Sequence, residues 1–440
     1  MTLLDLRAPT AEAIRTGIAD GSRQADTVAE ASIARIEQCD ESLGAFVDFN
    51  TSAVRTAVAA LPGPRKADRL YGVPVGVKDI IDTALLPTSY GSPIYAGHQP
   101  AADAYVVSRI RSLGAVIMGK TATAEFAWTH PPATANPWNP AHTPGGSSSG
   151  SAAAVAAGMV PIALGTQTSG SVIRPALYCG VIGIKPTFGT INRTGVKPAA
   201  DSLDTLGLFA REVADGSFFL DAVCGRNTEL PESGTGMTVG VLIPESTGVA
   251  PSMADDCALT ALERAAETLE ADGCTVRRMT VPAWYEEIFG LQETIAAYEG
   301  ARALAFERIA FGDMLSETLR RFLDEGARIS MKEYLAAIRR VDLLRPLADA
   351  WLSEVDAIAT IGVNGEAPSD RTTTGDPHFC RPWSALHTPS VAVPTAFGPA
   401  GMPIGVQIVA ARWCDARALC VAHRLDLGTR AERIDASVTR

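Results

Sequence analysis

The stretch from Pro144 to Pro186 constrains this chain more than any other, because it joins two serine–glycine clusters through a run of small apolar residues. It reads PGGSSSGSAAAVAAGMVPIALGTQTSGSVIRPALYCGVIGIKP. A segment with almost no charge and this much Ala, Val, Ile and Leu is not a solvated linker, so we expect it to be buried. Glycine lets backbone N–H groups approach a ligand, and serine hydroxyls can attack a carbon, relay a proton or donate a hydrogen bond. The stretch therefore predicts a buried serine nucleophile with backbone oxyanion donors.

We call Gly145–Ser151 the first serine cluster and Gly165–Ser171 the second. Gly146–Gly150 matches the G-x-S-x-G nucleophile elbow, which needs a strand before it, a helix after it and downstream acidic and histidine partners. The preceding residues, HPPATANPWNPAHTPGG, instead indicate a loop. A phosphate-binding loop at a helix N-terminus would need the ending G-K-[ST], which is missing. Close packing of small residues explains the alanines but leaves six serines without a role.

Composition favours a small-molecule substrate over a large polyanion. The chain has 440 residues, of which 47% are hydrophobic and 20% charged, and its formal net charge is -11. This acidic balance, with scattered Lys and Arg, argues against binding to nucleic acid or to an anionic membrane. The start of the sequence has no basic region followed by an apolar run, and no run of 18 apolar residues occurs. We therefore expect a cytoplasmic protein without a membrane span.

Cysteine and histidine patterns predict neither a disulfide framework nor a metal site. The eight cysteines show no CxxC and no regular spacing, which favours reduced, mostly buried thiols. The six histidines include no HExxH and no pair with Cys at zinc spacing. The sequence therefore predicts no metal and no cofactor.

Strand and helix patterns alternate through much of the chain. The β-branched run 70–81 predicts a buried strand with Lys78 near its end, followed by a helix over 102–113 and a strand over 115–120. This strand–helix–strand order favours parallel pairing. Further segments are expected as a helix over 151–157, strands over 160–164 and 237–242, a helix over 254–272, and strands over 357–363, 390–394 and 404–409, the last two forming a hairpin.

These elements predict an α/β fold in a single large domain over residues 1–440. Its central sheet would be twisted, mixed and mostly parallel, with helices on both faces. The core would take about residues 65–225 and 355–430. Residues 283–354 carry alternating charged and apolar positions and would form a helical cap over one side of the sheet. A helical face in that region could also serve a homodimer.

Both serine clusters and Lys78 resemble the amidase signature family. The resemblance rests on GGSSSGS at Gly145–Ser151, GTQTSGS at Gly165–Ser171 and GVPVGVKD around Lys78. Three further segments follow in the family's order, Gly119–Trp128, Lys185–Arg211 and Thr374–Pro394. The resemblance covers most of the chain and is weakest over 230–370. It implies the amidase signature fold, with Ser171 as nucleophile, Ser147 as a relay preceded by a cis peptide, and Lys78 as base.

The chemistry of these residue types supports the same assignment. A serine hydroxyl is a weak nucleophile and must pass its proton to a base, and no histidine here has a recognisable triad context. Lysine has an ordinary pKa of about 10.4, so it must be desolvated to act as a base near neutral pH. The apolar neighbours Val75, Val77, Ile80 and Ile81 fit that need.

The second serine cluster would supply the oxyanion hole, through the backbone N–H groups of Thr168, Ser169, Gly170 and Ser171. Three positions depart from the family pattern. Gln167 and Ser169 stand where family members commonly have Asp and Gly. Many members have Arg two residues after the nucleophile, where this chain has Ile173, and its Arg174 comes one residue later. Arg174 would bind a substrate carboxylate or ureido carbonyl, or else form a structural ion pair.

Residues near the two clusters are candidates for the substrate pocket. Gly146, Ser148, Phe126 and Tyr178 are expected at the site, with Trp128, His130 and His387 as weaker candidates for the pocket wall. Asp79 and Asp204 are interpreted as structural carboxylates that orient loops beside the site.

The resulting hypothesis is a hydrolase that cleaves the C–N bond of a small carboxamide or urea-like amide through a Ser171 acyl-enzyme. Lys78 would be the base and Ser147 the proton relay, with no cofactor. One alternative is the glutamine-hydrolysing subunit of an amidotransferase, which needs a partner chain. A non-enzyme alternative is an anion-binding module, which would bind without turnover.

Overall fold

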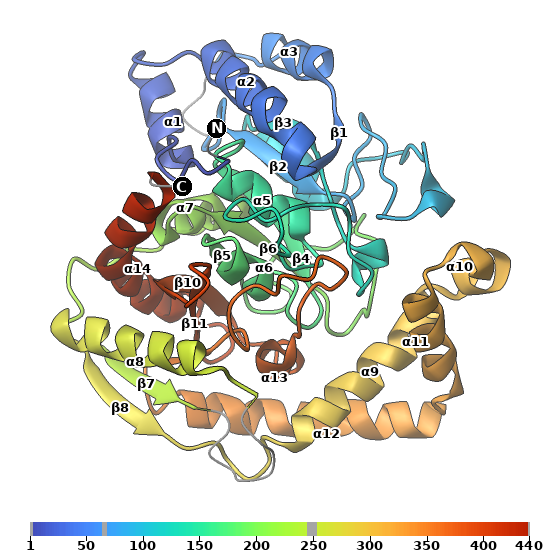
Figure 1. The fold of residues 1–440 in the computed structure, drawn as a ribbon, viewed down its shortest axis with the longest axis vertical. Helices are drawn as coiled ribbons and strands as arrows, with labels where there is room; N and C mark the ends of the chain where they lie inside the picture. The colour runs from blue at the N-terminus through green and yellow to red at the C-terminus, as the bar shows by residue number, and fades with distance from the viewer. Residues whose placement is uncertain (1–2, 64–67, 244–252, 439–440) are drawn as a thin grey trace.

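One sheet of 11 strands runs through the protein. In Figure 1 it extends from β1, β2 and β3 at the top to β7 and β8 at the lower left. The computed structural model describes residues 3–63, 68–243 and 253–438. In spatial order the strands are β1 (Phe46–Phe49), β3 (Val116–Thr121), β2 (Pro74–Lys78), β4 (Ile162–Gln167), β6 (Thr205–Ala210), β5 (Ile182–Lys185), β10 (Ser390–Phe397), β11 (Pro403–Val409), β9 (Ala357–Ile361), β7 (Thr238–Leu242) and β8 (Thr275–Met279).

The mixed sheet is confirmed, but antiparallel pairs outnumber the parallel ones that we expected as the majority. Among the described strands, four neighbouring pairs are parallel, namely β2–β3, β2–β4, β7–β8 and β7–β9. The other six pairs are antiparallel. Parallel neighbours need a long crossover, whereas the short turn between β10 and β11 joins an antiparallel hairpin, as predicted. β6 and β10 run antiparallel to both of their neighbours and account for four of the six pairs.

Small residues let the site-bearing elements pack closely. Strand β2 is buried along its whole length and lies between β3 and β4. Helix α5 (Ser149–Ala156) begins inside the first serine cluster and is also fully buried. A Cβ at Gly150 would lie 2.1 Å from the Ala45 carbonyl oxygen and 2.3 Å from the Ala122 nitrogen. Glycine is therefore required here for packing, because any side chain would push the helix away from this backbone.

Helices cover the sheet from several directions. Helix α5 packs on β2 and β4, while α7 (Val213–Cys224) packs on β5 and β6. Two further helices, α8 (Asp256–Ala271) and α14 (Asp415–Val438), pack on β10 and β11. The other described α-helices outside residues 283–354 are α1 (Ala11–Ala19), α2 (Ala25–Leu43), α3 (Thr51–Ala59), α4 (Tyr105–Ser112), α6 (Ile173–Tyr178) and α13 (Arg381–Ala385).

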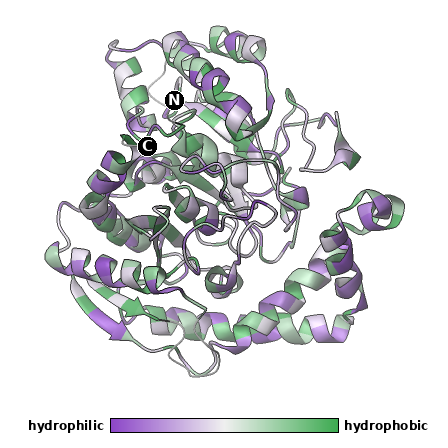
Figure 2. Cartoon of the chain, viewed as in Figure 1, coloured by the Kyte–Doolittle hydropathy of each residue, from purple (hydrophilic) through white to green (hydrophobic). Residues whose placement is uncertain are grey.

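Residues 283–354 are helical, as predicted. They form α9 (Glu287–Ala303), α10 (Ala305–Ala310), α11 (Glu317–Arg328) and α12 (Met331–Leu352), with α9 packed on both α11 and α12. In Figure 1 these helices form a long arm along the lower and right sides of the molecule. Hydrophilic and hydrophobic residues alternate along the arm in Figure 2, the pattern of helices with one buried face.

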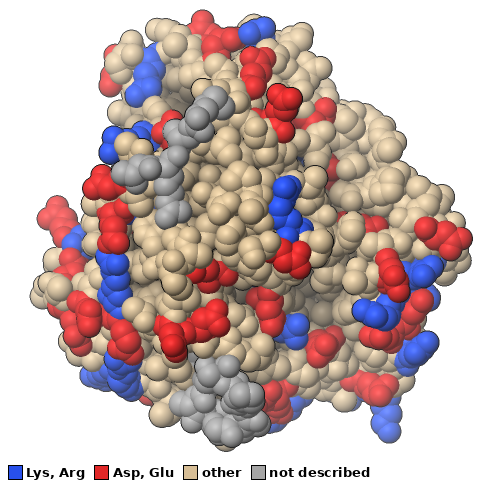
Figure 3. All heavy atoms as spheres, in the orientation of Figure 1, with Lys and Arg blue, Asp and Glu red and all other residues tan. Residues whose placement is uncertain are grey.

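Charges are mixed on the surface. On the face that Figure 3 shows, Lys and Arg side chains lie singly or beside Asp and Glu, and they gather into no broad basic patch. Within the three described ranges, no helix has both the length and the apolar composition that a membrane crossing needs.

Candidate active site

Lys78 is the last residue of β2 and is fully buried. Its Nζ lies 2.9 Å from Ser147 Oγ and donates a hydrogen bond of 2.8 Å to Thr166 Oγ1. Burial holds the pKa of Lys78 well below its ordinary value, and the nearby Asp204 opposes that shift only in part. The structure thus provides the desolvated lysine that the sequence led us to expect, with a serine hydroxyl in contact.

The first serine cluster presents Ser147 to this lysine and uses its other serines to hold the backbone. The Gly146–Ser147 peptide is cis, as the resemblance implied. Ser149 Oγ donates to the Gly145 carbonyl at 2.6 Å, and Ser151 Oγ donates to the carbonyl of Leu164 at 2.8 Å. Ser148, a candidate for substrate binding, is fully buried and its hydroxyl contacts the backbone of Thr166 instead.

Ser171 follows β4 in the second serine cluster and precedes the short helix α6. Its exposed fraction is 7%, whereas Ser147 is completely buried. In the part of the chain that the structure describes, the backbone N–H groups of Ser169, Gly170 and Ser171 donate no hydrogen bond. Unsatisfied N–H groups in a loop beside a candidate nucleophile are the donors that an oxyanion hole requires.

Gln167 supports this loop in place of the family's usual Asp. Its Oε1 accepts hydrogen bonds from the N–H groups of Val172 and Ile173, at 2.9 and 3.0 Å. Its Nε2 donates to Ser384 Oγ at 3.1 Å, and that hydroxyl donates to the Ser169 carbonyl at 2.7 Å. The amide therefore holds the loop from both sides of Ser171.

Two further side chains, Asp204 and Gln292, contact the second serine cluster from elsewhere in the chain. Thr168 Oγ1 donates to Asp204 at 2.5 Å, and the same carboxylate accepts the N–H groups of Ala199 and Ala200. Burial raises the pKa of Asp204 to about 6. Gln292 of α9 donates from Nε2 to Ser169 Oγ at 2.9 Å. Asp204 thus has the loop-orienting position that we predicted.

Arg174 turns toward the first serine cluster. Its side chain is buried, and Nη2 donates to the Gly146 carbonyl at 2.6 Å and to Thr374 Oγ1 at 3.3 Å. Nε and Nη1 have no hydrogen-bond partner among the described residues. Burial lowers the pKa of Arg174. The guanidinium therefore links the start of α6 to the first serine cluster and forms no ion pair with a described residue.

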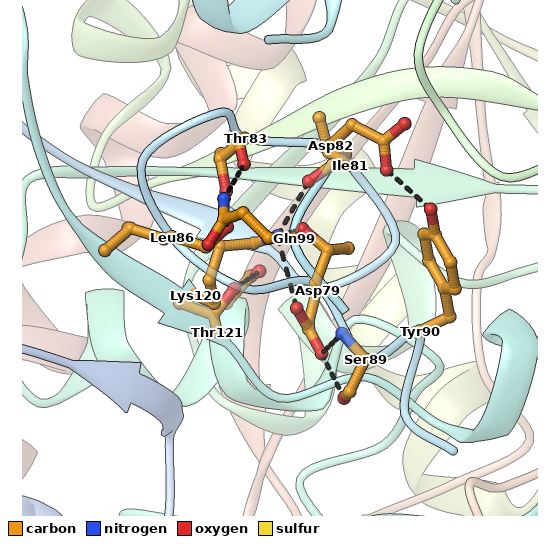
Figure 4. Close-up of polar contacts among 12 residues, drawn as sticks. Asp79, Ile81, Asp82, Thr83, Leu86, Ser89, Tyr90, Gln99, Lys120 and Thr121 are labelled. Atoms are coloured by element: carbon orange, nitrogen blue, oxygen red, sulfur yellow. Dashed lines mark hydrogen bonds and ion pairs between the residues drawn. The ribbon is translucent and has the colours of Figure 1, made fainter. Parts of the chain in front are cut away.

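Asp79, the residue after Lys78, forms a buried ion pair with Lys120, shown in Figure 4. Lys120 Nζ lies 3.2 Å from Asp79 Oδ1 and donates to the Ile81 carbonyl at 2.8 Å. Asp79 Oδ2 accepts hydrogen bonds from the Ser89 N–H and hydroxyl. The pair fixes the chain after the end of β2, so Asp79 has the structural position that we predicted.

A cavity of about 320 Å³ opens beside Ser169. It lies between the loop after η2 (Glu125–Ala127), helices α9 and α11, Pro377 just before η5 (His378–Cys380), and Arg381 at the start of α13. The residues that line it are Trp128, Thr129, Ser169, Gln292, Glu293, Ala296, Thr318, Leu319, Arg321, Phe322, Glu325, Pro377 and Arg381. Trp128, one of the weaker candidates for the pocket wall, lines this cavity, and the helical arm supplies most of the lining.

Four of the aromatic and histidine candidates do not line this cavity. Phe126 is fully buried, with its ring centroid 6.1 Å from that of Tyr95. Tyr178 is buried behind the first serine cluster, where a Cβ at Gly145 would lie 2.9 Å from its ring. His130 lines a separate cavity near the start of α11, and His387 stacks on Phe188 at 3.9 Å. These four residues are near the site motifs in sequence, but none of them lines the cavity beside Ser169.

Three residues that sequence reasoning missed belong to the site, namely Thr166, Gln292 and Ser384. Thr166 lies on β4, next to β2 in the sheet, and accepts a hydrogen bond from Lys78. In the sequence, only its hydroxyl five residues before Ser171 could have marked it as a site residue. Gln292 and Ser384 lie more than 100 residues from the second serine cluster, and no local pattern marks them.

Comparison with known proteins accounts for most of the chain. The family model described as Amidase matches residues 27–419. A glutamyl-tRNA(Gln) amidotransferase subunit of Anaeromyxobacter sp. (strain K) is 34% identical, across 93% of this chain and 94% of that protein.

Solved structures agree. A chain of the vestigial protein complex that reveals the evolutionary origins of an s-triazine catabolic enzyme has a TM-score of 0.85 at 28% identity, covering 95% of this chain and 98% of that one. 6-Aminohexanoate cyclic dimer hydrolase has a TM-score of 0.84 at 26% identity, covering 97% and 98%. Because the family model and these relatives each span most of its length, the chain belongs to the amidase signature family.

Proposed function

We propose that the protein hydrolyses the C–N bond of a small carboxamide through an acyl-enzyme on Ser171. The observation that carries the proposal is the buried Lys78, whose Nζ lies 2.9 Å from Ser147 Oγ. Because burial lowers the pKa of Lys78, its amine can be neutral and can accept a proton. When the neutral amine donates one N–H to Thr166, its lone pair can accept the Ser147 proton across the 2.9 Å contact.

In acylation, the Ser171 hydroxyl adds to the amide carbon as its proton passes to Ser147 and the Ser147 proton passes to Lys78. The N–H groups of Ser169, Gly170 and Ser171, with that of Thr168, stabilise the oxyanion. The C–N bond then breaks, and Lys78 returns the proton through Ser147 to the leaving nitrogen. Water attacks the ester carbon by the same route and releases the acid. Arg174 acts as a positioning residue, because it holds the Gly146 carbonyl next to Ser147.

The first test uses the purified chain alone. We expect it to release ammonia from simple primary amides, and we expect a fluorophosphonate probe to label Ser171, as located by peptide mass spectrometry. Binding of anions without turnover or labelling would instead identify an anion-binding module. Labelling at another serine would contradict the assignment of the nucleophile.

A second candidate function is the glutamine-hydrolysing subunit of an amidotransferase. The observation that favours it is the 34% identity to the glutamyl-tRNA(Gln) amidotransferase subunit described above, over nearly the full length of both chains. Such a subunit would hydrolyse glutamine efficiently only with its partner present. Comparable turnover of glutamine and of unrelated amides by the isolated chain therefore favours the free hydrolase.

Replacing Thr166 with Val should lower kcat/KM by about 10-fold, because Lys78 loses one hydrogen-bond partner that orients its amine. Steady-state kinetics on any amide that the wild type hydrolyses measures this effect. Thr360→Val is the matched control, since Thr360 is also buried in the sheet but donates to the Leu242 carbonyl. Equal losses of activity in the two variants would contradict a special role for Thr166.

A further inference from the structure

The cavity beside Ser169 has an apolar wall made of rings and small side chains. Trp128 and Phe322 pack together with their centroids 4.5 Å apart, and Leu319, Ala296 and Pro377 continue the surface. Trp128 also packs tightly on α9, where a Cβ at Gly300 would lie 2.6 Å from its ring. The wall is therefore anchored on the helical arm, and its apolar surface is suited to an apolar ligand group.

The cavity ends at the loop that we assign to the oxyanion hole. Ser169 lines the cavity two residues before Ser171, and its hydroxyl accepts the hydrogen bond from Gln292. Gln292 also lines the cavity, has an exposed fraction of only 2%, and its oxygen accepts no hydrogen bond from a described residue. A group held in this cavity thus lies against the loop that contains the nucleophile, with one amide oxygen free to accept a hydrogen bond.

Charges of both signs line the cavity and offset one another. Arg321 and Arg381 are matched by Glu293 and Glu325, and none of the four forms an ion pair with a described residue. A cavity with two charges of each sign has little preference for an anionic or a cationic ligand. Its volume of about 320 Å³ lies at the lower end for ligand pockets, which limits the ligand to roughly one ring.

We propose that this cavity binds the organic group of the substrate and selects uncharged amides that carry a single aromatic or alicyclic ring. The inference rests on the proposed hydrolysis at Ser171 and adds the class of substrate. Trp128 and Phe322 are the specificity-determining residues, because they form the surface that the ring contacts.

The test compares phenylacetamide with acetamide, which share the reacting amide and differ by the ring. Wild-type kcat/KM should be higher for phenylacetamide by on the order of 10- to 100-fold, since burial of one ring contributes that much to binding. Phe322→Ala should lower kcat/KM for phenylacetamide by roughly 10-fold while leaving acetamide within about threefold. Phe306→Ala is the matched control, because Phe306 lies on α10 with 61% of its surface exposed and should change neither value.

A cavity-filling variant, Ala296→Leu, gives a second and independent measurement, since it should also impair only the ring-bearing amide. Equal losses on both amides in both variants, or a wild type without preference for the ring, would overturn the proposal. Fluorophosphonate labelling distinguishes failure of the proposed substrate class from failure of the proposed hydrolysis at Ser171. Labelling of Ser171 without preferential hydrolysis of phenylacetamide overturns the substrate class alone, whereas absence of both labelling and hydrolysis overturns the proposed function as well.

Discussion

Ser171→Ala should abolish amide hydrolysis, lowering kcat by at least about 10⁴-fold. The variant retains the proposed oxyanion donors and the cavity but has no side-chain oxygen at position 171 that can form the acyl bond. Its fold should persist, because the Ser171 hydroxyl makes no hydrogen bond with any described residue and only a small polar atom is removed. Initial rates of ammonia release, together with a urea unfolding curve, measure both expectations.

Ser151→Ala is the control for this variant. Ser151 is another buried serine of the first serine cluster, and its hydroxyl donates to the Leu164 carbonyl without contacting Lys78. Its loss should cost about 1 kcal/mol of unfolding free energy and leave most of the activity. Turnover retained by Ser171→Ala would show that a different residue attacks the amide.

Lys78→Met should eliminate activity and at the same time stabilise the protein near neutral pH. In the unfolded chain Lys78 has its ordinary pKa, whereas burial lowers the pKa in the folded protein. Between the folded pKa and 10.5 the unfolded state binds more protons, so wild-type stability rises with pH across that window. Methionine removes this penalty, and we expect a gain in unfolding free energy at pH 7 that shrinks to nothing as pH approaches 10.5.

Urea unfolding of both proteins at several pH values between 7 and 10 measures this gain. Lys120→Met provides a contrast, because Lys120 is equally buried but lies 3.2 Å from Asp79. Its removal leaves a buried carboxylate without its cation and should cost roughly 3–5 kcal/mol. The interpretation of Lys78 fails if its methionine variant is destabilised like that of Lys120, or if its gain does not change with pH.

Several parts of this fold could be predicted from local sequence. The β-branched run before Lys78, the small-residue helix after the first serine cluster and the β10–β11 hairpin depend on neighbouring residues, and all three occur in the structure. Sheet order depends on contacts between distant segments. The position of β6 between β4 and β5 has no local signal, so the proportion of parallel strands was overestimated.

The same distinction separates the site residues. Lys78, Ser147 and Ser171 could be found because they lie in motifs, and the structure brings Lys78 and Ser147 into contact. Gln292 and Ser384 lie in helices without a distinctive pattern and reach the second serine cluster only through the tertiary fold. Phe126 also lies in a motif, but it is fully buried beside Tyr95 and does not line the cavity next to Ser169.

Gln167 also determines how the second serine cluster, which we propose forms the oxyanion hole, responds to acid. A carboxylate at this position would accept protons as the pH falls and would then lose acceptor strength toward the N–H groups that follow Ser171. The carboxamide has no such titration, and it accepts from Val172 and Ile173 while donating to Ser384. The hydrogen bonds of Gln167 are therefore insensitive to acid, whereas Asp204 is the carboxylate whose protonation near pH 6 can weaken its hydrogen bond from Thr168.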